Sequence, residues 1–306
     1  VKPVKGAFSV LARRIEEPDQ LRAHMRFGRP ERWLIRQLVE PFERVCRARL
    51  PQAGSAYRML LEEPVAPQTP QFNLDGWVRN GRVHALGVVD AVMYPGTQAF
   101  MRWEHPSRLD AAAQRRALEV AQRFLGAIGY EHGFFNLEFF YDDHDDRLRV
   151  IECNPRLASQ FSDLYERVHG VDAHAMALTL ALGADPQSLP RVRPTARAAA
   201  SLVYRAFDAN GDVPPAPAVP QREALARRFP DALLFSFAKM GRGRARDFRW
   251  TGSHRYGIVH LGGRDREHLR QGCEDASALL GWPAPYLDHG PLPARVHWAT
   301  PCLSSL

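Results

Sequence analysis

The sequence predicts an α+β fold in which antiparallel sheets are flanked by helices, followed by a smaller α+β region. Asn80 and Gly81 separate two runs of alternating apolar residues, which is a strong hairpin signal. The acidic segment "YDDHDD" separates two further strand-like runs, "GFFNLEFF" and "RLRVIECN". Between these pairs, the segment 107–128 carries apolar residues at helical spacing, and Ser107-x-x-Asp110 at its start matches a capping box.

The order of these elements predicts two domains. A helical run, "VDAHAMALTLALG", ends at Gly183, and "ADPQSLPRVRPT" after it has the composition of a linker. Strand-like runs and a helix from Arg264 to about Leu280 follow. We therefore predict a first domain at 1–183, a linker at 184–195 and a C-terminal α+β domain at 196–306.

Composition indicates a globular cytoplasmic protein. The 306 residues are 45% hydrophobic and 25% charged, which is enough for two hydrophobic cores. No run of 18 apolar residues spans a bilayer, and the first residues lack the pattern of a signal peptide. The cysteines are far apart, without CxxC spacing, and are predicted to be reduced thiols. They are Cys46, Cys153, Cys273 and Cys302.

The positive charge comes almost entirely from arginine. The formal charge is +7, and of the 41 Lys and Arg residues only Lys2, Lys5 and Lys239 are lysines. A lysine inside a motif is therefore informative. The segment "GRGRARDFRW" is basic and contains aromatic residues, but it matches no nucleic-acid-binding motif and is predicted to be a solvated loop. We expect neither a nucleic acid nor a membrane as partner.

The segment "RVIECNPRLASQF" places polar side chains at alternate positions as a strand ends. Glu152, Asn154 and Arg156 lean to one side of this strand, because successive side chains of a strand alternate between its faces. A strand edge that runs into an Asn-Pro turn is the simpler interpretation. The preceding strand repeats the pattern, however, with Asn136 and Glu138 on one face. Pairing of the two strands predicts one shared polar face.

Glu138, Glu152 and Asn154 supply the oxygen ligands that suit Mg²⁺. This ion takes one or two carboxylates and fills its other positions with water and phosphate. We predict a metal–phosphate site here. The segment "YDDHDDR" lacks the spacing and the closing glutamate of a calcium loop. His169 and His174 are five residues apart, which is the wrong spacing for one helical face, and a structural role is predicted for both.

These motifs resemble the closing motif of the ATP-grasp superfamily, and in particular its carboxylate-amine ligases. That motif is an acidic residue on one strand and Glu-x-Asn-Pro-Arg at the end of the next. The resemblance implies ATP and Mg²⁺ as cofactors. It implies that Glu138, Glu152 and Asn154 hold Mg²⁺ against the ATP phosphates. It further implies that Arg156 is catalytic and steadies the transferred phosphate.

Earlier segments resemble the nucleotide-binding parts of the same superfamily. "VKPVKGAFS" resembles the strand and mobile loop whose lysine, here Lys2, reaches the ATP phosphates. "LLEEPV" resembles the linker that holds adenine, with Glu62, Glu63 and Val65 in the nucleotide-contact positions. Gln71 stands where many members have a carboxylate on the ribose. The resemblance covers residues 1 to about 183.

The resemblance implies a ligase that activates a small-molecule carboxylate as an acyl-phosphate for attack by an amine. Amino-acid or peptide-like ligation is the expected reaction. One alternative is a biotin carboxylase-like enzyme, but those enzymes follow the arginine with Gln-Val-Glu-His, whereas this chain reads "RLASQF". A non-catalytic nucleotide-binding relative is the other alternative. Retention of Lys2, Arg156 and the three metal ligands favours the ligase.

The sequence begins without methionine and in a strand-like segment, "VKPVK". The N-terminal domain of the superfamily, with its earlier lysine, has no counterpart in this sequence. We therefore expect an N-terminal portion to be absent and the chain as given to have little ligase activity. An apolar face left by an absent neighbour would favour a homodimer.

Overall fold

The computed structural model groups the chain into two compact units. The described residues are 1–4, 11–50, 52, 54–66, 69–142, 144–237 and 239–286, without the side chain of Trp250. The first unit comprises Val1–Ala66 and Gly241–Gly252, and the second comprises Pro67–Met240 and Ser253–Leu306. The predicted loop after Lys2 (5–9) and Cys302 lie outside the described residues. Cys46, Cys153 and Cys273 are free thiols, as predicted.

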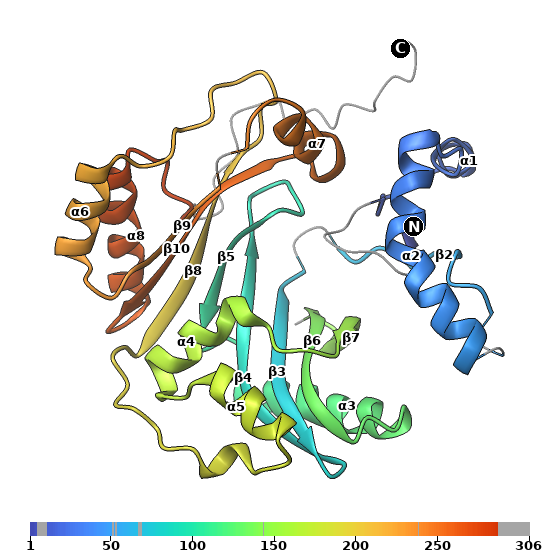
Figure 1. Cartoon of the computed structure of the whole chain (residues 1–306), viewed down its shortest axis with the longest axis horizontal. Coiled ribbons are helices and arrows are strands. Elements are labelled where there is room, and N and C mark those ends of the chain that lie inside the picture. The colour runs from blue at the N-terminus through green and yellow to red at the C-terminus, as the bar shows by residue number, and fades with distance from the viewer. Residues whose placement is uncertain are drawn as a thin grey trace. The chain divides into compact units, whose positions relative to one another are not determined.

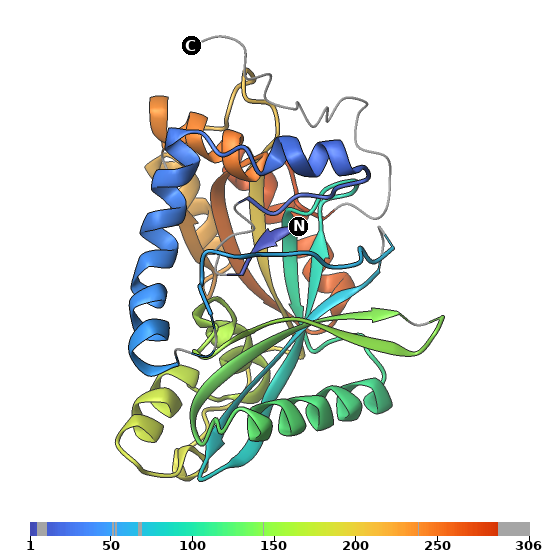
Figure 2. The same ribbon diagram turned by 90° about the vertical axis from the view of Figure 1, so that its right-hand side faces the viewer.

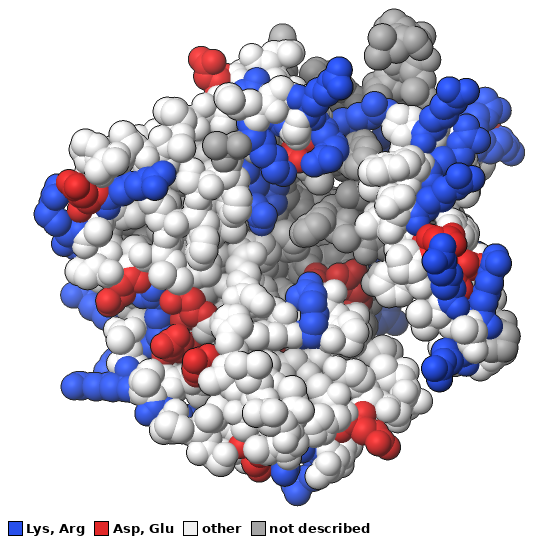
Figure 3. All heavy atoms as spheres, in the orientation of Figure 1, with Lys and Arg blue, Asp and Glu red and all other residues white. Residues whose placement is uncertain are grey.

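The first unit combines a short antiparallel sheet with helices. β1 (Lys2–Pro3) pairs with β2 (Met59–Leu60), so that Lys2 lies beside Leu60, the first residue of the predicted adenine linker. The helices are α1 (Pro18–His24), α2 (Arg29–Arg49) and α7 (Gly241–Thr251). Figure 3 shows Lys and Arg side chains gathered over α2 and over α7.

The prediction of a solvated loop at "GRGRARDFRW" is wrong, because this segment forms α7. Arginine and alanine are strong helix formers, and they outweigh the two glycines of the segment. The guanidinium of Arg249 donates to the carboxylate of Glu31 at 2.8 Å, and this ion pair connects α7 to α2.

The second unit is built on an eight-stranded sheet in the order β7-β6-β3-β4-β5-β8-β10-β9, with every neighbouring pair antiparallel (Figure 1). The strands are β3 (Gln71–Arg79), β4 (Arg82–Met93), β5 (Phe100–His105), β6 (His132–Asp142), β7 (Arg147–Asn154), β8 (Ala198–Ala206), β9 (Leu233–Ser236) and β10 (His254–Gly263). The predicted α+β class is confirmed.

Helices cover both faces of this sheet (Figures 1 and 2). They are α3 (Ala111–Ala127), α4 (Ser159–His169), α5 (Ala173–Ala181), α6 (Val219–Arg228) and α8 (Arg266–Leu280). α4 and α5 pack on one face. On the opposite face, α3 packs against β3, β4 and β6, and α6 and α8 pack against β8 and β10. Across the described residues, each helix is too short or too polar to span a lipid bilayer.

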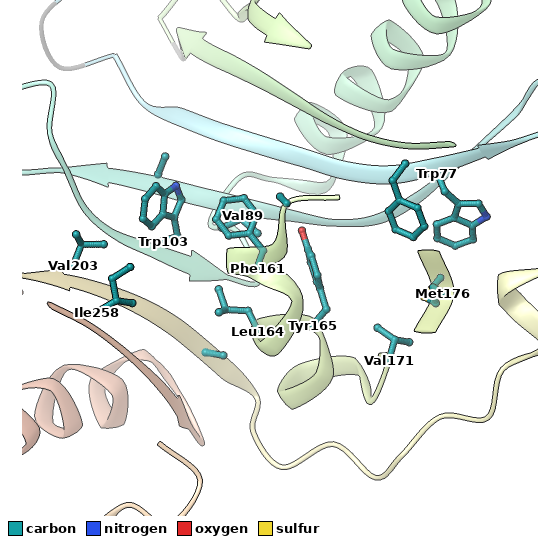
Figure 4. Packing of buried hydrophobic residues seen from close by; sticks show 14 of the residues in the cluster. Trp77, Val89, Trp103, Phe161, Leu164, Tyr165, Val171, Met176, Val203 and Ile258 are labelled. Carbon is teal, nitrogen blue, oxygen red and sulfur yellow. The ribbon is translucent and has the colours of Figure 1, made fainter. Parts of the chain in front are cut away.

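The core under α4 and α5 borders the candidate site. Trp77 of β3, Trp103 of β5 and Val203 of β8 belong to it, and α4 contributes Leu164 and Tyr165 (Figure 4). Leu164 and Tyr165 are fully buried. Burial of several large apolar side chains, each worth roughly 1.5–3 kcal/mol, fixes α4 against the sheet. This anchoring matters because the hydroxyl of Tyr165 contacts the site.

Two turn predictions have different outcomes. The Asn80-Gly81 hairpin is confirmed: both residues have positive φ, 52° and 73°, and they join β3 to β4. Ser107 does not cap α3, as its hydroxyl donates to Asp90 and accepts from the backbone of Leu109. The N-cap is Asp110, whose carboxylate accepts from the backbone N–H of Ala113 at 2.8 Å.

Residues 184–195, predicted as a linker, join α5 to β8 and contain a 3₁₀ helix at Pro186–Ser188. β8 pairs with β5 from Arg102↔Leu202 to His105↔Ala199. The sheet therefore continues from residues 71–154 into residues 198–263. The division into domains at 183 and 196 stays a prediction.

A β-bulge in β7 sets which side chains face the site. The register steps from Phe139↔Val150 to Glu138↔Glu152, so Ile151 is the extra residue. Leu148 and Cys153 are five positions apart, yet both pack on the α3 side. The bulge resets the alternation between them and leaves Glu152 and Asn154 on the opposite face.

Candidate functional site

Polar side chains form two rows across three neighbouring strands. One row is Asn73, Glu138 and Glu152, and the other is Asp75, Asn136 and Asn154, on β3, β6 and β7 respectively. Residues directly opposite each other in an antiparallel pair share a face and lie close together. The alternate residues of β3 and β6, among them Phe72, Leu74, Leu137 and Phe139, pack on the α3 side. The predicted shared polar face is therefore present and extends onto β3.

Hydrogen bonds connect Asn154 with both carboxylates of the first row. Nδ2 of Asn154 lies 3.2 Å from Oε1 of Glu138 and 3.2 Å from Oε1 of Glu152. Nε2 of Gln71 donates to Oε2 of Glu138 at 3.0 Å. The structure thus brings four of the predicted site residues into contact.

The two carboxylates lie in different environments. Glu138 is half-buried, whereas Glu152 is exposed. Burial, and then the negative charge of Glu152, raises the pKa of Glu138 from 4.5 to about 7. Two carboxylates that repel each other in a partly buried setting favour a cation between them.

In the second row, the residues on β3 and β6 are buried. Asp75 and Asn136 are at most 3% exposed. Asn136 Nδ2 donates to one oxygen of Asp75 at 2.6 Å, and the Tyr165 hydroxyl donates to the other at 2.7 Å. Burial raises the pKa of Asp75 to about 7, although these two hydrogen bonds act in the opposite direction.

Arg156 follows β7 and precedes α4. Its side chain is exposed, and Nη1 donates to the backbone oxygen of Leu157 at 3.2 Å. Its positive charge lowers the pKa values of Glu138 and of Asp75, against the larger effect of burial. An exposed guanidinium close to these carboxylates is suited to contact an anionic ligand.

The remaining predicted nucleotide contacts lie in the first unit. Lys2 Nζ and Glu62 Oε2 are 2.7 Å apart, so the structure brings these two residues together. Glu63 is exposed and Val65 is half-buried, in a stretch without regular secondary structure. Gln71 belongs to the second unit and contacts Glu138, one of the predicted metal ligands.

The sequence analysis missed Asn73, Asp75 and Tyr165 as site residues. The available signal was the alternation in "QFNLDGWV", where Gln71, Asn73 and Asp75 occupy every second position of a strand. No local pattern marks Tyr165, because it approaches Asp75 from a separate helix, α4.

The side chains present fit a Mg²⁺ ion. Within the described residues, no three His, Cys, Asp or Glu side chains converge as metal ligands. Glu138 and Glu152 instead offer two carboxylates, with the amide of Asn154 in reach of both. Mg²⁺ commonly binds through one or two carboxylates and keeps water or phosphate in its other positions.

Residues 85–189, about a third of the chain, match the family model described as the carbamoyl-phosphate synthase L chain, ATP binding domain. This segment includes Glu138, Glu152, Asn154 and Arg156. In this match, in its antiparallel sheet and in its flanking helices, the chain is similar to the ATP-grasp superfamily.

Solved structures are similar to this chain at low sequence identity. L-amino acid ligase from Bacillus licheniformis is 15% identical with a TM-score of 0.54, over 69% of this chain and 52% of that chain. N5-carboxyaminoimidazole ribonucleotide synthetase from Thermus thermophilus is 20% identical with a TM-score of 0.49, over 78% and 57%. Biotin carboxylase from Campylobacter jejuni is 19% identical with a TM-score of 0.49, over 71% and 47%. The chain matches about half the length of these structures. A search of curated protein sequences finds no match.

Proposed function

We propose that this chain is the catalytic part of an ATP- and Mg²⁺-dependent ligase that joins a carboxylate to an amine. The observation that carries the proposal is the contact of Asn154 with both Glu138 and Glu152 on one face of β6 and β7. The raised pKa of Glu138 supports it, because a bound cation relieves the repulsion that contributes to the raised value.

The roles of the residues follow from their chemistry. Glu138, Glu152 and Asn154 hold Mg²⁺, which when bound neutralises phosphate charge. Arg156, with its exposed guanidinium, binds the phosphate that is transferred. Lys2 binds the ATP phosphates, and the backbone of the segment with Glu62, Glu63 and Val65 holds the adenine. Gln71 donates to the ribose hydroxyls.

The proposed reaction has two steps. A carboxylate oxygen of the acid attacks the terminal phosphorus of ATP, and the bond from that phosphorus to the ADP oxygen breaks. The amine nitrogen then attacks the carbonyl carbon of the acyl-phosphate, phosphate leaves with the C–O bonding electrons, and the nitrogen loses a proton. The substrates are a small-molecule acid and amine, and an amino acid is the proposed acid.

Binding of Mg²⁺ and ATP provides the first test. Calorimetric titration of ATP in the presence of Mg²⁺ should show binding to the wild-type chain. Glu152→Gln should weaken binding by about tenfold or more, because one of two charged ligands is lost. Glu119→Gln makes the same chemical change at an exposed residue of α3, on the other face of the sheet, and should leave binding unchanged.

Turnover provides the second test. Phosphate release is measured with ATP, Mg²⁺ and a panel of amino acids as acid and amine. We expect release only when both substrates are present, and a loss of about 10²-fold in Arg156→Ala. ATP binding without release would favour a non-catalytic relative, and release that depends on bicarbonate and biotin would favour the biotin carboxylase-like alternative. Size-exclusion chromatography tests the proposed homodimer.

A further inference from the structure

A line of hydrogen bonds leads from the buried carboxylate of Asp75 to the predicted metal ligand Asn154. Asp75 accepts from Asn136 Nδ2 at 2.6 Å and from the hydroxyl of Tyr165 at 2.7 Å. Oδ1 of Asn136 in turn accepts from Nδ2 of Asn154 at 3.2 Å. Asp75, Asn136 and Tyr165 are buried, so water does not compete for these bonds.

Above its raised pKa of about 7, the Asp75 carboxylate is ionised and only accepts hydrogen bonds, and in that state the line has a direction. Asn136 must turn its NH₂ group toward Asp75, and the oxygen of Asn73 at 3.3 Å is a second acceptor for the same group. The oxygen of Asn136 is then left facing Asn154. Asn154 must therefore present its nitrogen to Asn136.

The consequence concerns the oxygen of Asn154. None of the hydrogen bonds that the described residues make with Asn154 uses its Oδ1. Its nitrogen also lies 3.2 Å from Glu138 and from Glu152. When a cation occupies the carboxylate oxygens, the bond to Asn136 is the one that still orients the amide, and Oδ1 is the atom left to bind the cation.

We propose that Asp75 is a positioning residue, which acts through Asn136 to hold the amide of Asn154 with its oxygen available to Mg²⁺. This inference rests on the proposed function, since it assigns Asn154 to the metal. It adds a buried acid on β3 that touches neither metal nor nucleotide. Two rival accounts are a long-range charge effect of Asp75 and a general contribution of Asp75 to packing.

A double-mutant cycle on metal affinity separates these accounts. Mn²⁺ alone serves as the probe, and electron paramagnetic resonance measures the free ion in titrations of the whole chain. Asp75→Asn allows the line to reverse, since its new amide can donate to Asn136. Asn136→Ala breaks the line without a change of charge. Each variant is made in the wild-type chain and in an Asn154→Asp background, where the two side-chain oxygens are equivalent and need no orientation.

In the wild-type background, we expect Asp75→Asn and Asn136→Ala each to weaken Mn²⁺ binding about tenfold, as for other residues that orient a metal ligand. In the Asn154→Asp background, neither should weaken it. Glu119→Gln, at an exposed residue of α3 on the other face of the sheet, is the control. It should alter Mn²⁺ affinity by less than about twofold.

Equal losses in both backgrounds would show that Asp75 acts through charge or packing, and would overturn the proposal. If one of the two variants Asp75→Asn and Asn136→Ala does not fold, the other still forms a complete cycle with Asn154→Asp. Failure of both to fold would assign the line to the stability of the core and would also overturn it. If the wild-type chain binds no Mn²⁺, or Glu152→Gln binds it as tightly as the wild type, the proposed function fails and this proposal fails with it. If Glu152→Gln loses Mn²⁺ and the cycle still shows equal losses, only the positioning role fails.

Discussion

Glu138 and Glu152 are opposite each other on β6 and β7. Their repulsion should lower the stability of the fold when both are ionised. Burial and then Glu152 raise the pKa of Glu138 to about 7 from an ordinary value of 4.5. A carboxyl group whose pKa is higher in the folded chain than in the unfolded chain destabilises the fold when it ionises. The stability that protonated Glu138 preserves is therefore lost as the pH rises from 4.5 through about 7.

We expect Glu152→Gln to reduce this loss, because the substitution removes the second of the two causes of the raised pKa. The gain in the free energy of unfolding should be on the order of 1 kcal/mol above pH 7 in EDTA, and near zero at about pH 4. Urea unfolding at both pH values measures it, with Glu119→Gln as the control. A gain of equal size at both pH values would contradict this account, and so would no gain at all.

At the scale of elements, the position of α4 on the sheet depends on Gly87 of β4. Gly87 is opposite Asp75, and a Cβ atom at this position would lie 2.7 Å from Cε1 of Tyr165 and 2.8 Å from Cε1 of His105. Both rings are buried, so neither can move without a shift of its backbone. The absence of a side chain at Gly87 is what admits the ring of Tyr165.

Gly87→Ala should therefore destabilise the protein by about 1–3 kcal/mol, the usual cost of overpacking. Gly126→Ala is the matched control. It lies in α3 with nothing within 4 Å of the added Cβ, and alanine is the better helix former by up to about 1 kcal/mol. Urea unfolding should show opposite signs for the two variants. A neutral or stabilising Gly87→Ala would mean that Tyr165 is not held where the structure places it.

Element types were predictable from the sequence where a local signal exists. Turn residues at Asn80-Gly81 and helical spacing in α3 are such signals, and both predictions held. The paired carboxylates on β6 and β7 were also predictable, because strand alternation and a short turn together bring Glu138 to Glu152. α7 was missed because its glycines and arginines also suit a loop.

The buried part of the site on β3 was not predictable from the sequence of that strand alone. Alternation places Asn73 and Asp75 on one face of β3, but it does not say which face is shared with β6 and β7. That choice is set by the packing of Phe72 and Leu74 against α3, which is a tertiary effect. The contact of Tyr165 with Asp75 likewise depends on how α4 packs on the sheet.

At the scale of the whole second unit, a buried ion cluster joins the two halves of the sheet, which are the strands within residues 71–154 and those within residues 198–263. It does so by connecting β5 to α8, which packs on β8 and β10. Glu104 of β5 is 1% exposed and accepts from Arg102 at 2.7 Å, from Arg266 of α8 at 3.0 Å and from the hydroxyl of Tyr286 at 2.7 Å. Burial acts to raise the pKa of Glu104, but Arg102 and the other partners outweigh burial and hold it below 4.5. The stability from this ionised group is present above 4.5 and is lost as the pH falls through the lower folded value.

Glu104→Gln should destabilise the second unit by about 3–5 kcal/mol, because it leaves the buried guanidinium of Arg102 without its counter-charge. Arg108 is another partner of the Glu104 carboxylate, but its own side chain is 58% exposed. Arg108→Gln should therefore lower the free energy of unfolding by less than about 1 kcal/mol. Hydrogen exchange of β5 and α8, together with urea unfolding, measures both. Similar small effects of the two substitutions would show that the cluster does not join the halves of the sheet.

The β-bulge at Ile151 should make β7 tolerant of the loss of one residue. Removal of one residue from a regular strand exchanges the faces of all residues beyond it. β7 already contains one residue in excess, so deletion of Ile151 would give regular pairing, with Val150↔Phe139 followed directly by Glu152↔Glu138. The chain should fold and still bind Mn²⁺ after this deletion, whereas deletion of Cys153 should move Glu152 to the α3 side and abolish binding. Loss of folding in both deletions would show that the twist of the bulge itself, and not only the register it sets, is needed.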